Sequence, residues 1–157
     1  MLDLRFSVTL WQMWEVSFLA LAIWREARGE PFDAKVAVAH SVLNRVFRPS
    51  WWGRDVVSVL KKKWQYSSLT DPKDAQLTTW PDATDASFEE CLNVAHGCMD
   101  GIYKSPVPGA DSYYDDSITP PKWADPRFFV GKVGKLNFYN LDQDIEDGTW
   151  GLKTSEV

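Results

Sequence analysis

The sequence predicts an α+β domain that is mainly α-helical. Through the first two thirds of the chain, apolar side chains recur at the three- and four-residue spacing of one helical face. In the C-terminal third, short aromatic segments are bounded by Gly, Pro and Asp, which is typical of small strands. At 157 residues the chain is most simply one domain, 1–157. We therefore expect a helical body followed by a small β element.

The first helix is predicted to begin near Thr9 and to end within a residue or two of Arg28. Gly29 can adopt the left-handed conformation that ends a helix, and Pro31 cannot continue one. Apolar residues at helical spacing form its buried face: Val16, Leu19, Ile23 and Ala27. Three tryptophans at similar spacing are also expected in the core: Trp11, Trp14 and Trp24.

Three further helices are predicted from N-cap residues that precede apolar stripes. The expected caps are Asp33 for the second helix, Asp55 for a short third helix, and Asp85 or Ser87 for the fourth. Pro49 is expected to close the second helix. Residues 65–83 have loop composition, and long loops in compact domains are often functional, so we expect this one to form the rim of a cleft.

The strands are predicted at 112–114, 127–130 and 136–139. Beyond Tyr139 the acidic residues 140–157 show no periodicity, and we expect this tail to wrap around the domain or fray.

The charge pattern argues against two classes of partner. The net charge of −5 makes a nucleic-acid partner, bound through its phosphates, unexpected. Asp3, Arg5 and Glu15 interrupt the apolar start and leave uncharged runs of nine residues, whereas a spanning helix needs roughly 20. We therefore expect no stable membrane insertion. No signal peptide is recognised, so synthesis in the cytoplasm is expected.

Neither a disulfide nor a metal site is predicted. Cys91 and Cys98 lie seven residues apart on one expected helix, about 10 Å between α-carbons, and a disulfide needs less than about 7 Å. With His40 and His96 as the only histidines, no usual zinc-ligand spacing occurs. We expect free thiols, no metal and no cofactor.

Glu26 is the strongest catalytic candidate. It falls in the last turn of the first helix, beside apolar side chains, where the helix dipole disfavours an anion. Desolvation also favours the protonated acid, which is the form that general-acid cleavage of a glycosidic bond requires. The alternative is a surface glutamate paired with Arg25 or Arg28.

Several motifs together resemble the spore cortex-lytic family of cell wall hydrolases over about residues 18–139. The opening motif, Glu-Ala-Arg-Gly-Glu-Pro at 26–31, is the most specific of them. The other landmarks follow in order: Ala37-Val38-Ala39, Val42-Leu43-Asn44-Arg45-Val46, Gln65-Tyr66-Ser67, Gly109-Ala110, Tyr113-Tyr114, Trp123, and Gly134 through Phe138-Tyr139.

The resemblance implies a lysozyme-like fold and the degradation of peptidoglycan glycan strands. It also implies that Glu26 is the acid and base that cleaves the bond between N-acetylmuramic acid and N-acetylglucosamine. Many members are lytic transglycosylases, which leave a 1,6-anhydro end. The short single-domain form looks more like a phage endolysin, released through a holin to act at the cell wall, and we expect a monomer.

Three positions depart from the family pattern. Ala34 stands where the family usually has Gly, and Tyr66 stands where it usually has Phe. Leu136-Asn137 occupies a stretch in which the family tends to have a His, so no role for that His is carried over.

A hydrolytic muramidase would need water and a second carboxylate, about 5 Å away for retention or about 6.5–9.5 Å for inversion. The candidates are Glu30, Asp111, Asp115 and Asp116. Glu30 is as well explained by a solvated turn or a pair with Arg28 or Arg45, and the three aspartates by ordinary loop chemistry.

Flat side chains and an amide near the family landmarks are candidates for sugar binding, although packing is as good an explanation for each loop tryptophan. They are Trp64, Gln65, Tyr66, Tyr114, Trp123 and Tyr139. Asn44 is better explained as a donor to loop backbone.

Two other classes of function stay open: a non-catalytic glycan-binding module, and an amidase or peptidase that cuts the peptide stems.

Overall fold

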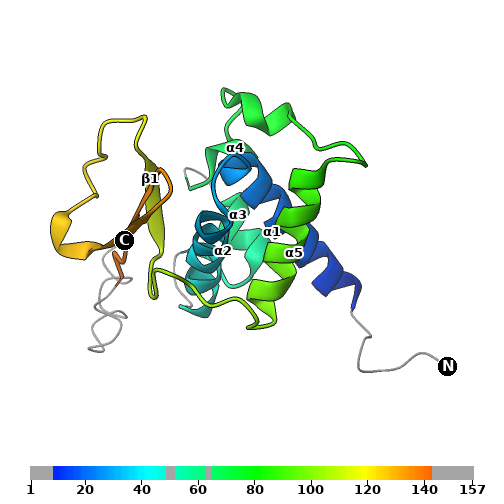
Figure 1. Cartoon of the computed structure of the whole chain (residues 1–157), viewed down its shortest axis with the longest axis horizontal. Helices are drawn as coiled ribbons and strands as arrows, with labels where there is room; N and C mark the ends of the chain where they lie inside the picture. Colours follow the sequence, from blue (N-terminus) through cyan, green and yellow to red (C-terminus); the bar gives the residue numbers. More distant parts are fainter. Residues whose placement is uncertain (1–8, 49–51, 63–64, 143–157) are drawn as a thin grey trace.

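The computed structural model describes residues 9–48, 52–62 and 65–142, and helix α1 (Leu10–Ala27) runs through the centre of the helical body (Figure 1). The helix begins as predicted, because the Thr9 hydroxyl accepts from the Gln12 amide while the Gln12 side chain accepts from the Thr9 amide. Its second half is buried, with Leu19 and Ile23 fully inaccessible to solvent. Glu26 therefore lies at the end of the buried half of this helix.

The first turns of α1 differ from the prediction. Trp11 and Trp14 are 51% and 52% exposed, so their assignment to the core was wrong. The reason is visible in Figure 1, where the N-terminal end of α1 projects past α5 and no other element of the described residues covers it. Trp14 instead stacks on Phe18, with ring centroids 5.6 Å apart. Trp24, in the packed half of the helix, is buried as predicted.

The helices α2 (Phe32–Phe47), α3 (Val56–Lys61) and α5 (Ala86–Met99) complete the body. Asp55 and Asp85 cap α3 and α5 as predicted, accepting from the amides of Ser58 and Phe88. Asp33 is not the cap of α2, because Pro31 takes that position and Asp33 lies in the first helical turn. Gly29 has no positive φ, so α1 ends without a left-handed residue there. Pro49 lies outside the described residues.

The segment 65–83 is more ordered than a loop. It contains the short helix α4 (Ser67–Thr70) and the 3-10 turn η2 (Ala75–Thr78). Asp74 caps η2 by accepting from the amide of Gln76, over 2.8 Å. This segment lies at the C-terminal end of α1, where α4 contacts that helix (Figure 1).

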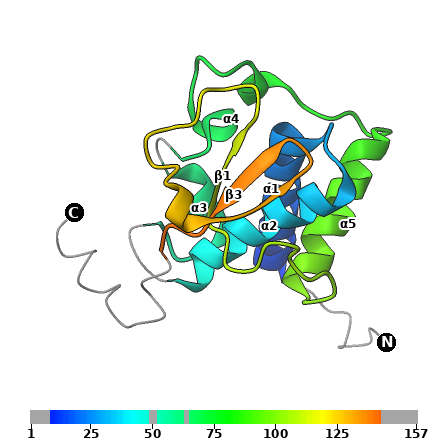
Figure 2. The ribbon, with the colours of Figure 1, turned by 60° about the vertical axis from the view of Figure 1, so that its left-hand side comes forward.

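The predicted strands form a three-stranded antiparallel sheet in the order β1-β3-β2. Their bounds are β1 (Ser112–Asp115), β2 (Phe129–Val133) and β3 (Leu136–Tyr139), while the 3-10 turn η3 (Pro126–Phe128) takes the start of the second predicted strand. The register pairs Tyr113 with Phe138. The sheet lies at one side of the helical body in Figure 1, and in Figure 2, where that side is turned forward, it lies in front of the helices.

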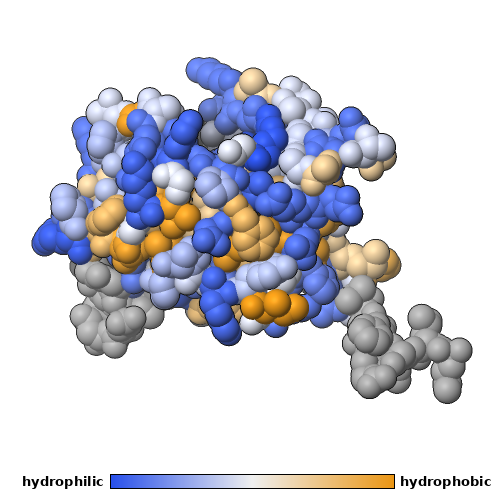
Figure 3. All heavy atoms as spheres, in the orientation of Figure 1, coloured by the Kyte–Doolittle hydropathy of each residue, from blue (hydrophilic) through white to orange (hydrophobic). Residues whose placement is uncertain are grey.

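The surface seen in Figure 3 is mainly hydrophilic, and hydrophobic residues gather on the side where the sheet lies. No described helix is long and apolar enough to cross a membrane. Cys91 and Cys98 are buried free thiols, as predicted. Of the predicted tail, Asn140 and Asp142 are buried, and residues 143–157 lie outside the described residues.

Candidate active site

Glu26 lies in the last turn of α1 and is partly buried. Its Oε1 accepts a hydrogen bond of 2.9 Å from the hydroxyl of Ser68 in α4. Burial of the carboxyl raises its pKa, and the nearby negative charge of Asp74 acts in the same direction. The Ser68 hydrogen bond and the hydroxyl of Tyr113 oppose this rise. Because burial is the largest influence, the net effect favours the neutral acid.

The arginines on either side of Glu26 do not pair with it. Arg25 donates to the carbonyl oxygens of Thr79 and Ser68, both over 3.1 Å. Arg28 donates over 2.7 Å to the Gln76 side chain. Both guanidinium groups therefore hold the 66–80 segment against α1, and the alternative of an arginine-paired Glu26 does not hold.

Two cavities meet at Glu26, and Asp115 also lines both of them. We call the smaller one, of about 520 Å³, the acidic cavity, since its wall also includes Glu30 and Asp116. The larger one, of about 690 Å³, is the aromatic cavity. Its aromatic and polar wall includes Arg45, Trp52, Gln65, Tyr66, Tyr113, Tyr114 and Trp123. Glu26 thus lies where the two cavities join, with open space on either side of its carboxyl.

In the acidic cavity, all three candidate second carboxylates already have partners. Asp116 forms a 2.6 Å ion pair with Lys132 and accepts from the Asn137 side chain, and these contacts lower its pKa. The Glu30 carboxylate accepts a 3.3 Å hydrogen bond from the backbone amide of Lys135 in the β2–β3 turn. Asp115 accepts from the amide of Ser117, over 2.7 Å.

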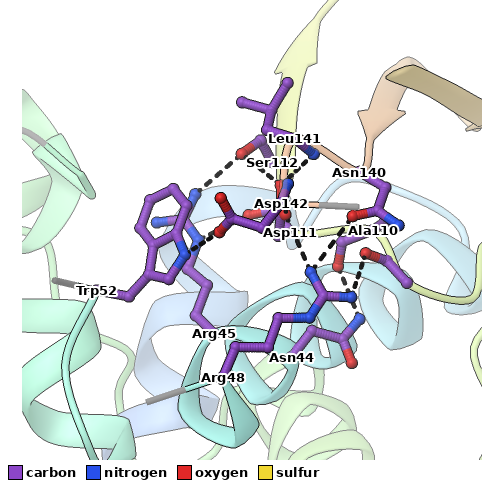
Figure 4. A network of polar contacts seen from close by, with 11 residues as sticks. Asn44, Arg45, Arg48, Trp52, Ala110, Asp111, Ser112, Asn140, Leu141 and Asp142 are labelled. Carbon is purple, nitrogen blue, oxygen red and sulfur yellow. Dashed lines mark hydrogen bonds and ion pairs between the residues drawn. The ribbon is translucent and has the colours of Figure 1, made fainter. Parts of the chain in front are cut away.

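The fourth candidate, Asp111, is separated from Glu26. It is fully buried, does not line the described cavities, and pairs with Arg48 over 3.0 Å. Its carboxylate also accepts from the Ser112 hydroxyl and from the amides of Leu141 and Asp142. Figure 4 shows this network, which joins the end of α2 to the residues on either side of the sheet. Its geometry is that of a structural ion pair.

Most of the predicted sugar-binding residues lie around the aromatic cavity. Gln65, Tyr66, Tyr114 and Trp123 line its wall. Tyr139 is buried beneath, stacked on Tyr114 with ring centroids 5.9 Å apart and edge-on to Trp123 at 5.6 Å. Trp64 lies outside the described residues. As predicted, Asn44 donates to loop backbone, at the Ala110 carbonyl over 2.8 Å.

Three side chains beside Glu26 were missed in the sequence. Ser68 follows a family landmark directly, and Tyr113 precedes the tyrosine that was chosen. Arg45 is buried in the wall of the aromatic cavity, with its guanidinium 4.1 Å from the ring centre of Trp52. Alternation along β1 could have indicated Tyr113, because it shares a face of the strand with Asp115. Among the described residues, no cluster of His, Cys, Asp and Glu could hold a metal ion.

A comparison against family models agrees with this arrangement, in which Glu26 lies at the end of a helix, two cavities adjoin it, and the sheet follows the helices in the chain. Residues 29–139 match the Cell Wall Hydrolase family, so the chain belongs to that family. The match begins three residues after Glu26.

The curated relatives include the spore cortex-lytic enzymes of Halalkalibacterium halodurans and Bacillus subtilis, 28% and 27% identical to this chain. These alignments cover 80% and 79% of this chain but 34% and 37% of the relatives. The chain therefore spans about a third of the length of these two proteins.

Two solved structures are similar to the fold. The catalytic domain of the germination-specific lytic transglycosylase SleB from Bacillus anthracis has a TM-score of 0.62 and 26% identity, covering 80% of this chain and 93% of that one. The catalytic domain of the Bacillus cereus SleB protein has a TM-score of 0.57 and 26% identity, covering 80% and 88%. The predicted mainly helical α+β fold is confirmed.

Proposed function

We propose that this chain degrades peptidoglycan by cleaving its glycan strands between N-acetylmuramic acid and N-acetylglucosamine, with Glu26 as the catalytic acid. The observation that carries the proposal is the position of Glu26, where burial raises the carboxyl pKa and two cavities meet. Family membership and the similarity to a lytic transglycosylase domain support the same substrate class.

In the proposed reaction, the proton of Glu26 passes to the oxygen that bridges the two sugars, and the bond from that oxygen to the muramic C1 breaks. An oxocarbenium-like state develops on the muramic ring. The C6 hydroxyl oxygen of that ring then bonds to C1, and its proton returns to Glu26. The product is a 1,6-anhydro end, the acid is regenerated, and no second carboxylate is used.

The ion pairs of Asp111 with Arg48 and of Asp116 with Lys132 support this route, since they engage two of the four candidate carboxylates. A hydrolytic muramidase is the second candidate. It is favoured by Asp115, which lines both cavities together with Glu26 and could activate a water. Incubation in ¹⁸O-labelled water separates the two, because only hydrolysis places the label in the new sugar end.

The aromatic cavity is the proposed site for part of the glycan strand. Tyr114 and Trp123 offer flat faces to sugar rings, and Gln65 and Tyr66 offer polar groups to their substituents.

Binding of peptidoglycan strands by a monomer, and release through a holin in phage-mediated lysis, stay predictions. Co-expression with and without a holin tests the latter, since lysis is expected only when both are present.

The proposal is tested by comparing the native protein with Glu26→Gln on purified sacculi, following turbidity. The variant keeps the shape of the side chain and removes the acid, so clearing should fall at least a hundredfold, within the usual effect of general acid catalysis of about 10²–10⁴. Glu15→Gln, on the exposed half of the same helix, is the matched control and should clear normally. Full activity in Glu26→Gln would place the active centre elsewhere, and an absence of clearing by the native protein would leave a binding module as the explanation.

A further inference from the structure

Two tyrosines that line the aromatic cavity together with Glu26 have buried hydroxyls without a hydrogen-bond partner among the described residues. They belong to Tyr66, which is 3% exposed, and to Tyr113. A buried hydroxyl that makes no hydrogen bond lowers the stability of a fold, and most buried polar groups in proteins are paired. Two such groups at one place therefore call for a functional explanation.

The surrounding packing holds both rings in place. Tyr113 lies opposite Phe138 in the sheet, and their ring centroids are 5.5 Å apart. Tyr66 lies under the guanidinium of Arg45, 5.1 Å from its ring centre. The Tyr113 hydroxyl lies near the Glu26 carboxyl in the wall of one cavity and lowers its pKa, but no hydrogen bond of good geometry joins the two groups. Both side chains line the aromatic cavity.

The protonation state of Glu26 decides how strong an acceptor these donors meet. A neutral carboxyl is a weak acceptor, and the Ser68 hydroxyl already occupies Oε1. A carboxylate accepts several hydrogen bonds, which are stronger than those to a neutral group. Donors left unused by the neutral acid are therefore placed where negative charge develops when the proton leaves, as electrostatic preorganisation requires.

We propose that Tyr113 is a positioning residue whose hydroxyl hydrogen-bonds to Glu26 once that group has given up its proton, with Tyr66 behind it as a second donor. The inference rests on the proposed function of Glu26 as the acid. In the resting enzyme Glu26 is neutral and the two hydroxyls stay unpaired. At the stage of the reaction at which Glu26 is an anion, they form hydrogen bonds to it.

Other charged groups around Glu26 also bear on its titration. The acidic ones are Glu30, Asp74, Asp115 and Asp116, and the basic ones that line the same cavities are Arg45 and Lys135. A change from Tyr113 to Phe leaves all of them in place. A difference between the native protein and this variant therefore reports on the hydroxyl.

The first experiment follows the carboxyl carbon of Glu26 by ¹³C NMR across a pH range, without substrate, using Glu26→Gln to assign the signal. The Tyr113→Phe variant should show a higher Glu26 pKa than the native protein, because a donor that favours the anion is gone. Tyr66→Phe should shift it in the same direction by less. Tyr103→Phe, whose hydroxyl contacts Asn93 outside both cavities, should leave it unchanged.

The second experiment measures sacculus clearing against pH. In Tyr113→Phe the alkaline limb should move to higher pH, because the acid stays protonated longer, while the maximal rate falls about ten- to a hundredfold. Its melting temperature should equal or exceed that of the native protein, since an unpaired buried hydroxyl has been removed.

An unchanged Glu26 pKa in Tyr113→Phe, or lost activity accompanied only by a lower melting temperature, would overturn the inference and make the tyrosine structural. The NMR titration does not depend on activity. A shifted pKa in a protein whose Glu26→Gln form still clears sacculi would support the hydrogen bond and reject the proposed function.

Discussion

Ser68 contacts two consecutive residues of helix α1, one through its hydroxyl and one through its carbonyl oxygen. Its hydroxyl donates to Glu26 over 2.9 Å, and its carbonyl oxygen accepts from Arg25 over 3.1 Å. The catalytic candidate and the segment 65–83 are thereby fixed to each other at one point. The orientation of Glu26 depends on this segment as well as on the helix.

Replacing Ser68 by Ala should lower activity about fivefold while the fold is kept. The variant removes one hydrogen bond to the carboxyl, worth about 1 kcal/mol, and leaves the Arg25 contact to the backbone intact. It should also raise the pKa of Glu26, since the serine opposes the effect of burial. Clearing rates over a pH series measure both effects. Ser105→Ala is the control, and equal rates in all three proteins would contradict the role of Ser68.

Glu26→Gln should stabilise the protein at neutral pH. Because burial raises the pKa of Glu26, the unfolded chain loses this proton at a lower pH than the folded one. Stability is therefore complete below the ordinary pKa of Glu, about 4, and declines as pH rises towards the raised value. The variant avoids that decline, so its gain in melting temperature should be present at pH 7 and absent at pH 3. A gain that is the same at both would contradict this account.

Asp111→Ala should destabilise the fold by about 3–5 kcal/mol, because it leaves Arg48 and two backbone amides without their buried partner. Urea unfolding measures this loss. Asp125→Ala, in an exposed pair with Arg127, is the control and should leave the unfolding midpoint unchanged. If Asp111→Ala instead stayed stable and lost only activity, Asp111 would be a catalytic carboxylate after all.

Trp123→Ala should weaken substrate binding more than catalysis. The ring is 38% exposed and lines the aromatic cavity, where a sugar can lie against it. We expect KM for soluble glycan fragments to rise about tenfold, with kcat changed little. Trp80→Ala removes a tryptophan that is 68% exposed and lies over Arg25, outside both cavities. A similar KM for both variants would argue against a sugar contact at Trp123.

Local signals in the sequence were enough to place the helix starts and the strands. Thr9, Asp55 and Asp85 cap helices through contacts within three residues, which a short stretch of sequence contains. The failures at Trp11 and Trp14 have a different cause, since exposure depends on where α5 ends in space.

The same difference between local and long-range contacts explains which residues of the candidate site could be predicted. Glu26 could be chosen from its own helix and the motif that follows it. Ser68 and Tyr113 lie 42 and 87 residues further along the chain, and only the fold brings them to the carboxyl. Asp111 and Asp115 look alike in sequence, yet packing buries one in an ion pair and leaves the other in the wall of both cavities.

Mass spectrometry of sacculi digested in parallel by the native protein and by Glu26→Gln tests the central claim most directly. The native protein should release muropeptides with intact stems and 1,6-anhydro ends, each one water lighter than a reducing end, and the variant should release none. Free stem peptides, or the same products from both proteins, would contradict the assignment of glycan cleavage to Glu26.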